Sequence, residues 1–291
     1  MMARYTTYGR TIESEQELAL PRAEEGPGTA EPVFRLSTDQ SARPGATASY
    51  RLLDLAELTL HEGRRVHVRQ LEPMSEAILQ HLLVDVAVPT ALTAWDQPVL
   101  HASAVDWGQG AVLFTGPSGS GKSTIAIAAA TRGARLVADD GVLVEMGDRS
   151  GIGSITTLRL HAEHAAELLP TGQTGEVVTL TGKRWVDAAA EGIELASGAR
   201  PVLGLFAIDR AGEARSEVRV SRLRAAEATD VIVRSFFTPP GPPAMALEYL
   251  DRASSIAGWL PVWRLEYPRE LAATDAVLAA VQAVTSDVAV A

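Results

Sequence analysis

Gly116-Pro117-Ser118-Gly119-Ser120-Gly121-Lys122-Ser123 is the stretch that decides the fold of this 291-residue chain. It matches the phosphate-binding pattern G-x-x-x-x-G-K-[ST] at every fixed position. The pattern predicts a short buried strand at residues 111–115 and a helix at residues 124–130. In that order, backbone N–H groups and the positive end of a helix dipole converge on one point. This glycine-rich loop (residues 116–123) therefore predicts a nucleoside triphosphate site.

The residue types in the glycine-rich loop suit different parts of phosphate chemistry. Lys122 would neutralise the outer phosphates, and the hydroxyl of Ser123 would join the coordination shell of Mg²⁺. We therefore expect ATP and Mg²⁺ as cofactors. The residues expected to bind the nucleotide are Gly116, Ser118, Gly119, Ser120, Gly121, Lys122, Ser123 and Thr124.

The composition indicates a folded, acidic chain. Apolar residues make up 46% of the sequence, and the formal net charge is -10. This charge argues against a nucleic acid or an anionic membrane as partner, because such binding needs clustered Lys and Arg. The chain has no cysteine, which excludes disulfides, thiolate metal ligands and cysteine nucleophiles.

Targeting signals are not evident in the sequence. We find no stretch that approaches the roughly 20 apolar residues needed to span a bilayer. The first residues carry charges at Arg4, Arg10 and Glu13 and lack the apolar core of a signal peptide. We therefore expect a cytoplasmic protein without a membrane partner.

The order of predicted elements divides the chain into two regions. Residues 1–92 are expected to form a β-rich accessory region with one helix, and residues 93–291 the domain with the glycine-rich loop. Closely spaced strands before that loop favour antiparallel neighbours, so we expect an α/β fold with a mixed sheet. The strand at 142–146 is expected to be the hairpin partner of the strand at 135–138. The other expected strands lie within 4–20 and at 33–36, 52–60, 65–69, 101–105, 110–115, 200–208 and 262–265, and the expected helices lie at 73–92, after Lys122, after the Pro-rich break at 238–243 and at the C-terminus.

Two carboxylates follow the strand predicted at residues 135–138. Asp139 and Asp140 come at the distance expected for a neighbouring strand whose C-terminal end opens on the same crevice. One carboxylate could hold Mg²⁺, and the other could accept the proton of an attacking hydroxyl, as in kinases. The alternative is an ordinary turn at Asp140-Gly141 that Asp139 caps. The sequence does not assign the two roles.

Three segments together resemble the catalytic domain of HPr kinase/phosphorylase. They are Leu100-His101-Ala102-Ser103-Ala104-Val105, residues 110–124, and Arg132-Gly133-Ala134-Arg135-Leu136-Val137-Ala138-Asp139-Asp140. The resemblance implies a P-loop core like the C-terminal domain of HPr kinase, which is related to phosphoenolpyruvate carboxykinase. It also implies that ATP binds the glycine-rich loop and that Ser123 and Asp140 hold Mg²⁺. The catalytic residues it implies are His101, Lys122, Asp139 and Asp140, with His101 and one aspartate organising or deprotonating an acceptor serine.

Two differences separate the chain from enzymes that act on HPr. Their signature of the Glu-x-Arg-Gly-x-Gly type is missing from residues 152–160, and the first 90 residues do not resemble their regulatory domain. Instead, Tyr8-Gly9-Arg10-Thr11-Ile12-Glu13-Ser14-Glu15 and Leu158-Arg159-Leu160 resemble a shorter branch that includes kinases of lasso-peptide precursors. That branch implies transfer to the C-terminal serine of a peptide, and the family implies a homo-oligomer.

Arg159, Lys183 and Arg184 are candidates for a further cation at the phosphate site. A transferring phosphoryl group spreads negative charge over its oxygens, and a nearby cation stabilises that charge. Lys183 and Arg184 are expected on a turn, and the alternative for all three is a solvated surface position. His161 and His164 are spaced for a pair on a helix, but no third metal ligand is evident, so we interpret them as a polar helix face.

The leading hypothesis is an ATP- and Mg²⁺-dependent kinase that transfers the terminal phosphoryl group to a serine hydroxyl of a peptide or small protein. The first alternative is a small-molecule kinase of the same fold. The second is a non-catalytic, ATP-binding regulatory module, against which the adjacent carboxylates of Asp139 and Asp140 argue.

Overall fold

The computed structural model describes residues 2–24, 31–38, 46–52, 54–154, 158–172, 177–178, 182–209, 217–238, 243–268 and 270–289. Its strands form three sheets. The first has six strands in the order β1-β2-β3-β6-β5-β4. Its strands are β1 (Ala3–Thr7), β2 (Arg10–Ser14), β3 (Arg35–Ser37), β4 (Ala46–Leu52), β5 (Ala56–His61) and β6 (Arg65–Gln70).

Two tight turns build most of this sheet. The predicted hairpin of β5 and β6 is confirmed, and Gly63 and Arg64 in its turn have φ angles of 70° and 54°. Tyr8 and Gly9 join β1 and β2 in the same way, with φ angles of 50° and 65°. Two consecutive left-handed residues match the right-handed twist of the flanking strands. For residues 4–20, which include β1 and β2, the sequence indicated only a possible strand.

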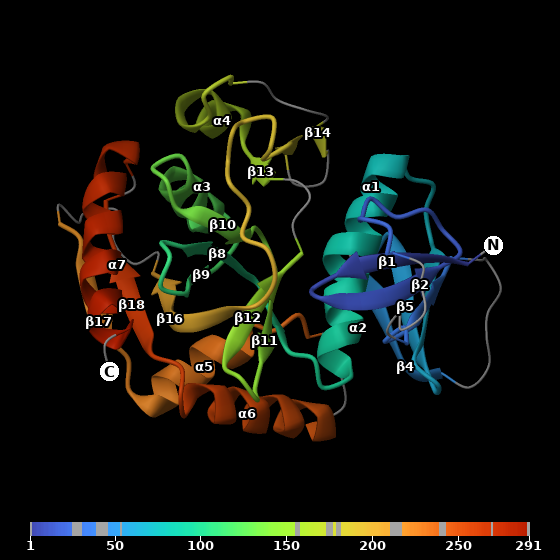
Figure 1. Cartoon of the computed structure of the whole chain (residues 1–291). Coiled ribbons are helices and arrows are strands. Elements are labelled where there is room, and N and C mark those ends of the chain that lie inside the picture. The colour runs from blue at the N-terminus through green and yellow to red at the C-terminus, as the bar shows by residue number, and fades with distance from the viewer. Residues whose placement is uncertain are drawn as a thin grey trace.

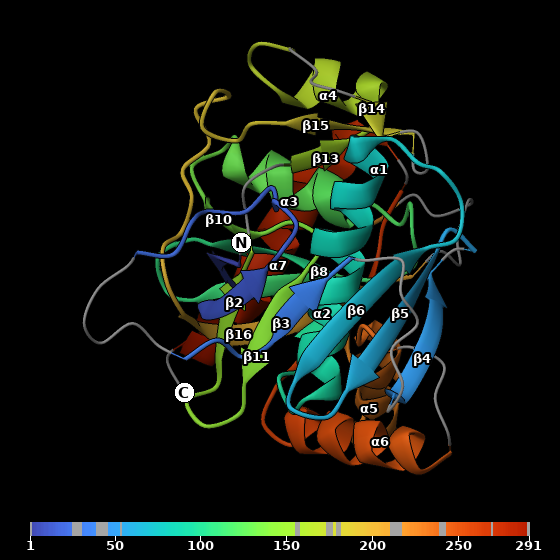
Figure 2. The ribbon, with the colours of Figure 1, turned by 90° about the vertical axis from the view of Figure 1, so that its right-hand side faces the viewer.

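The predicted helix at residues 73–92 runs continuously from Glu76 to Ala94. It begins as α1 (Glu76–Gln80), passes through a π-helical segment (His81–Ala87) and ends as α2 (Val88–Ala94). Pro89 accounts for the π-helical segment, because proline cannot donate to the carbonyl one turn earlier and its ring crowds that turn. The helix lies between the first and second sheets (Figure 1), and Figure 2 shows the first sheet in front of it.

By length and composition this helix could cross a membrane, with a mean hydropathy of 1.5 over its most apolar window. The expectation that no such stretch exists is therefore wrong. However, 67% of that window is buried inside the fold. The apolar side chains pack on the first sheet, as those of a core helix do, and core helices pass the same test.

The second sheet has nine strands and is mixed, as predicted. β8 (Ala102–Asp106) pairs antiparallel with β9 (Ala111–Thr115) and with β10 (Arg135–Ala138). β16 (Arg200–Ile208) runs parallel to β9 and to β18 (Val262–Glu266). The other strands are β7 (Val99–Leu100), β11 (Val142–Glu145), β12 (Ser150–Gly153) and β17 (Arg219–Arg222).

Helices cover both faces of the second sheet (Figure 1). One face is covered by α3 (Lys122–Ala130) and α7 (Thr274–Ala289). A short 3-10 helix (Leu271–Ala273) precedes α7. α5 (Ala225–Ser235) and α6 (Pro243–Ala257) pack on the other. Residues 239–242 of the predicted Pro-rich break before α6 lie outside the described residues. The third sheet adjoins α3 and contains β13 (Leu158–Leu160), β14 (Val177–Val178) and β15 (Lys183–Val186), with α4 (Ala162–Leu168) after β13.

One predicted strand pairing is wrong. β11 does not form a hairpin with β10 but pairs with β12 and β7, several strands away in the same sheet. The reason lies at Asp140, whose left-handed φ of 84° turns the chain out of β10. The backbone of β12 then passes so close to β10 that a Cβ at Gly153 would overlap the carbonyl of Val137. A short link between two apolar runs suggested a hairpin, but the turn conformation favours a crossover.

The packing of β16 against β18 can be tested by a substitution at Gly204. A methyl group added at Gly204 would overlap the indole ring of Trp263, which also stacks on Phe206 with ring centroids 4.9 Å apart. We expect Gly204→Ala to lower the free energy of unfolding by about 1–3 kcal/mol, because overpacking forces neighbours out of position. Gly147→Ala is the control, since a Cβ there meets no atom within 4 Å. Equal denaturant midpoints for the two variants would contradict this packing.

Candidate functional site

The direction of the strands brings the expected site residues to one edge of the second sheet. β10, β9, β16 and β18 all run the same way, so their C-terminal ends share that edge. β8 runs the opposite way and therefore begins there. The edge carries His101 before β8, the glycine-rich loop after β9, Asp139 and Asp140 after β10, Asp209 after β16 and Tyr267 after β18.

The glycine-rich loop joins β9 to α3 through three left-handed glycines. Gly116, Gly119 and Gly121 have φ angles of 147°, 71° and 107°, which side chains other than glycine rarely adopt. The ammonium group of Lys122 folds back over the loop and donates to the carbonyls of Gly116 (2.9 Å) and Pro117 (3.3 Å). Ser123 and Thr124 lie in the first turn of α3. The strand, loop and helix therefore have the arrangement that the motif requires.

The loop fits a phosphate group on two observations. A Cβ at Gly116 would lie 2.9 Å from both the carbonyl oxygen of Ile208 and the hydroxyl of Ser120, so only glycine leaves this backbone open. The Ser120 hydroxyl is buried and has no hydrogen-bond partner within the part of the chain that the structure describes. An unsatisfied buried hydroxyl costs about 1–3 kcal/mol, which a bound oxyanion would offset. A phosphate group suits this set of hydrogen-bond donors.

The two aspartates have different surroundings. Asp139 is 7% exposed, and its carboxylate accepts a hydrogen bond of 2.9 Å from the hydroxyl of Ser103. Asp140 is more accessible and lies 3.5 Å from the imidazole Nε2 of His101. The structure thus separates a buried carboxylate from one that shares a polar contact with a histidine.

His101 is held in place through its backbone. Its N–H donates to the carbonyl of Ser235 (2.5 Å), and its carbonyl accepts from the hydroxyl of Thr115 (3.0 Å). Its ring meets the edge of Phe237, with ring centroids 5.3 Å apart. Burial lowers the pKa of His101 below its usual value of 6.5, against the opposing attraction of Asp140. The positive charges of Lys122 and Lys183 lower this pKa further, Asp139 opposes them, and the net shift disfavours the charged ring.

The three further cations lie on the third sheet. Lys183 and Arg184 are on β15 rather than on a turn, and Arg159 lies in β13 opposite Trp185. The expectation of one turn presenting both cations is therefore wrong, because successive strand residues face opposite sides of a sheet. The positive charge of Lys183 contributes to lowering the pKa of His101.

The predicted histidine pair lies at the start of α4. The rings of His161 and His164 are 6.1 Å apart. Within the described ranges, no group of three or more His, Cys, Asp or Glu could hold a metal ion. The interpretation of this pair as a polar helix face stays a prediction.

The first site element that the sequence does not reveal is the turn between β1 and β2. Tyr8 is 5% exposed and lines a small cavity together with Asp139, Asp140, Ser154 and Phe237. A Cβ at Gly141 would overlap the hydroxyl of Tyr8. Next to it, the hydroxyl of Thr7 donates to that of Ser154 over 2.6 Å. No local pattern marks a tyrosine as a long-range neighbour of the aspartates.

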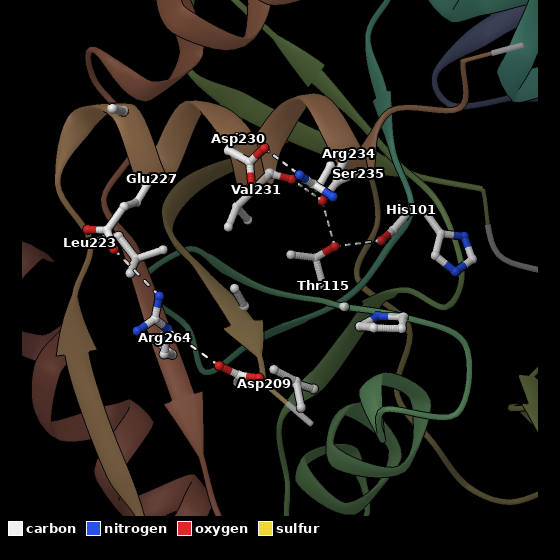
Figure 3. Close-up of a pocket in the computed structure, with 15 residues that line it drawn as sticks. His101, Thr115, Asp209, Leu223, Glu227, Asp230, Val231, Arg234, Ser235 and Arg264 are labelled. Atoms are coloured by element: carbon white, nitrogen blue, oxygen red, sulfur yellow. Dashed lines mark hydrogen bonds and ion pairs between the residues drawn. The ribbon is translucent and has the colours of Figure 1, made fainter. Parts of the chain in front are cut away.

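The second missed element is a cavity of about 700 Å³ beside the glycine-rich loop. It extends from His101 to Arg264 beneath α5, as Figure 3 shows. Asp209 lines it and directly follows β16. The sequence could have indicated Asp209 as a site residue, because it follows an apolar strand and ligands bind outside the carboxyl ends of parallel strands.

Comparisons with known proteins give likenesses of structure but none of sequence. No protein-family model matches the chain, and no curated protein matches it in sequence. Its structure is similar to the Hpr(Ser) kinase/phosphatase from Coxiella burnetii, with a TM-score of 0.32 and 13% sequence identity. The match covers 65% of this chain and 95% of that one. A TM-score of this size assigns no function, which has to come from the residues of the site.

The environment of His101 predicts its titration. We expect its imidazole to titrate below pH 6.5 in ¹⁵N NMR spectra, because burial disfavours the charged ring. Asp140→Asn should lower the midpoint further, and Lys183→Gln should raise it. Arg184→Gln, on the opposite side of β15, is the control and should leave it unchanged.

The lowered pKa of His101 also predicts that the stability of the protein changes with pH. An unfolded histidine binds its proton near pH 6.5, before the folded one does. The contribution of His101 to stability is therefore complete above that pH and falls as the pH drops below it. A titration midpoint at or above 6.5 would contradict the neutral ring.

The contact between Tyr8 and Gly141 can be tested by a double-mutant cycle. Gly141→Ala should destabilise the protein, because its methyl group would displace the Tyr8 hydroxyl or the backbone beside Asp140. In a Tyr8→Phe background the hydroxyl is gone, so the same change should cost less. We expect a coupling of about 0.5–3 kcal/mol in the free energy of unfolding, the range for residues in contact. Additive effects would show that the two residues do not touch.

Proposed function

We propose that the protein is a kinase that uses ATP and Mg²⁺ to phosphorylate a serine hydroxyl of a peptide or small protein. The observation that carries the proposal is the shared sheet edge, where the glycine-rich loop lies beside the contact between Asp140 and His101. The loop supplies donors for a phosphate chain. The contact supplies a base and a neutral partner for it. A module that only binds nucleotide needs the first of these and not the second.

The glycine-rich loop would hold the phosphates through its backbone N–H groups. Lys122 would exchange its two carbonyl partners for phosphate oxygens, since an ammonium group gains more from an anion than from neutral carbonyls. Ser123 and Asp139 would hold Mg²⁺, which when bound neutralises charge on the phosphate oxygens. The hydrogen bond from Ser103 keeps the Asp139 carboxylate in one orientation.

Asp140 is the proposed proton acceptor. The acceptor hydroxyl gives its proton to the Asp140 carboxylate as the serine oxygen forms a bond to the terminal phosphorus. The bond between that phosphorus and the leaving ADP oxygen breaks, and its electron pair stays on ADP. Neutral His101, at 3.5 Å from Asp140, orients the carboxylate without neutralising it. This assigns Asp140 to proton transfer and leaves the metal to Asp139, whereas the family resemblance alone implied Asp140 for Mg²⁺.

A peptide acceptor is supported by two features. The cavity of about 700 Å³ next to His101 is in the size range of ligand pockets in proteins. The segment from Tyr8 to Glu15, which resembles that of lasso-peptide precursor kinases, begins at the turn beside the aspartates. We therefore propose the C-terminal serine of such a precursor as the first acceptor to test.

Three substitutions test the roles. Lys122→Ala should abolish ATP binding, measured by calorimetry. Asp140→Asn should leave ATP binding intact and slow phosphoryl transfer by about 10²–10⁴-fold, the usual contribution of a general base. Asp251→Asn, on an exposed position of α6, is the control.

Transfer is measured by mass spectrometry of serine peptides incubated with ATP and Mg²⁺. The expected product carries one added phosphate on serine and forms together with ADP. Full transfer by both Asp139→Asn and Asp140→Asn would contradict the mechanism. ATP binding without transfer to any peptide would contradict the peptide acceptor.

A further inference from the structure

The cavity beside the glycine-rich loop has an apolar lining and a charged rim. Ile208 and Leu223 contribute buried side chains to it, and Ala207, Ala226 and Val231 add further apolar surface. The rim carries the charged residues Asp209, Glu227, Asp230, Arg234 and Arg264. Such a combination of apolar surface and a few polar groups is typical of sites that bind organic ligands.

The cavity lies at the end of the loop where the terminal phosphate is expected. In motifs of this kind the lysine reaches the outer phosphates. Here the ammonium group of Lys122 lies at the carbonyls of Gly116 and Pro117, the first residues of the loop. Gly116 and Pro117 also line the cavity, together with His101. The cavity therefore opens on the reacting end of the phosphate chain, and the nucleoside would leave the loop at the opposite end, past Ser123 and Thr124.

The charged rim restricts what the cavity accepts. Arg264 lies between Asp209 and Glu227, at 3.6 Å and 3.5 Å, and Arg234 pairs with Asp230 at 2.8 Å. Both arginines thus already face carboxylates. With three carboxylates against two guanidinium groups, the rim repels an acidic occupant and tolerates a neutral or basic one.

We propose that this cavity is the acceptor pocket and that it holds an apolar side chain adjacent to the serine that is phosphorylated. The proposal rests on the proposed kinase function and adds the sequence preference of its acceptor. The apolar side chain fills the space between Ile208, Leu223 and Val231 under α5. The neighbouring serine then lies at the His101 end of the cavity, where Figure 3 shows His101 opposite Arg264. Its hydroxyl then reaches Asp140, which lies 3.5 Å from the Nε2 atom of His101.

The preference is measured with peptides of the form acetyl-Gly-Gly-X-Ser, which end in the serine, and with a second set of the form acetyl-Gly-Gly-Ser-X-Gly-amide, in which X follows the serine. We expect kcat/KM to be about tenfold or more higher for X = Leu or Ile than for X = Gly in one of the sets, because filling an apolar pocket gives discrimination of this order. X = Glu should be the poorest substrate. Transfer that is independent of X in both sets would overturn the proposal while leaving the kinase function in place.

A matched pair of variants locates the preference. Ala226→Trp places an indole at the cavity, whereas Ala225→Trp places it one residue earlier on α5, outside the residues that line the cavity. Both positions are exposed, so both variants should fold. Ala226→Trp should remove the preference for Leu and Ile and raise KM for those peptides without changing the Kd of ATP. Ala225→Trp should change neither.

Two results would assign the cavity differently. A weaker Kd for ATP in Ala226→Trp, with the Kd of inorganic tripolyphosphate unchanged, would make it the nucleoside pocket and overturn the proposal. Wild-type protein that binds ATP but phosphorylates no peptide in either set would contradict the proposed function itself, and the acceptor pocket with it. The two failures are distinguishable because only the second abolishes transfer.

Discussion

The antiparallel pairing of β8 with β9 is the interaction on which the site depends. Its register sets Ala102 opposite Thr115, so His101 and Gly116 leave the sheet as neighbours. The hydroxyl of Thr115 then bonds the carbonyl of His101. A slip of one residue would turn every side chain of β8 to the other face of the sheet, and Ser103 would no longer meet Asp139. The ladder between β8 and β9 thus aligns the histidine and the loop, and the pairing of β10 with β8 adds the buried aspartate.

Local patterns in the sequence predicted the strands and helices at this edge of the sheet, but little of the strand pairing and long-range contacts between them. The order of strand, glycine-rich loop and helix follows from apolar runs and glycine spacing, and Arg200–Ile208 is found where its apolar run lies. The pairing of β11 was mispredicted because it depends on one left-handed residue, Asp140, which no periodicity reveals. Lys183 and Arg184 were misplaced for a related reason, since strand β15 is short and gains its pairing from β13 and β14. Tyr8 depends on contact across more than a hundred residues, which a local pattern does not carry.

The first sheet contributes directly to the environment of the aspartates. Its turn between β1 and β2 packs against Gly141 and Ser154, and Arg10 just after that turn pairs with Glu145 of β11 and hydrogen-bonds Gln97 at 2.7 Å. Because Gly141 directly follows the left-handed Asp140, the hydroxyl of Tyr8 limits how far that backbone can relax. The glycine at 141 and the tyrosine at 8 are therefore a steric pair, in which the missing side chain of one makes room for the other.

The electrostatics of His101 are consistent with the proposed role of Asp140 as the base. If the imidazole were charged, it would form an ion pair with Asp140, and the carboxylate would become a poorer proton acceptor. Burial opposes that charge, and Lys122 and Lys183 oppose it further, so their combined effect exceeds the attraction of Asp140 and Asp139. The same lysine that would hold the phosphates thus helps to keep the histidine neutral. A neutral ring at 3.5 Å from Asp140 leaves the negative charge of that carboxylate available for the proton transfer proposed above.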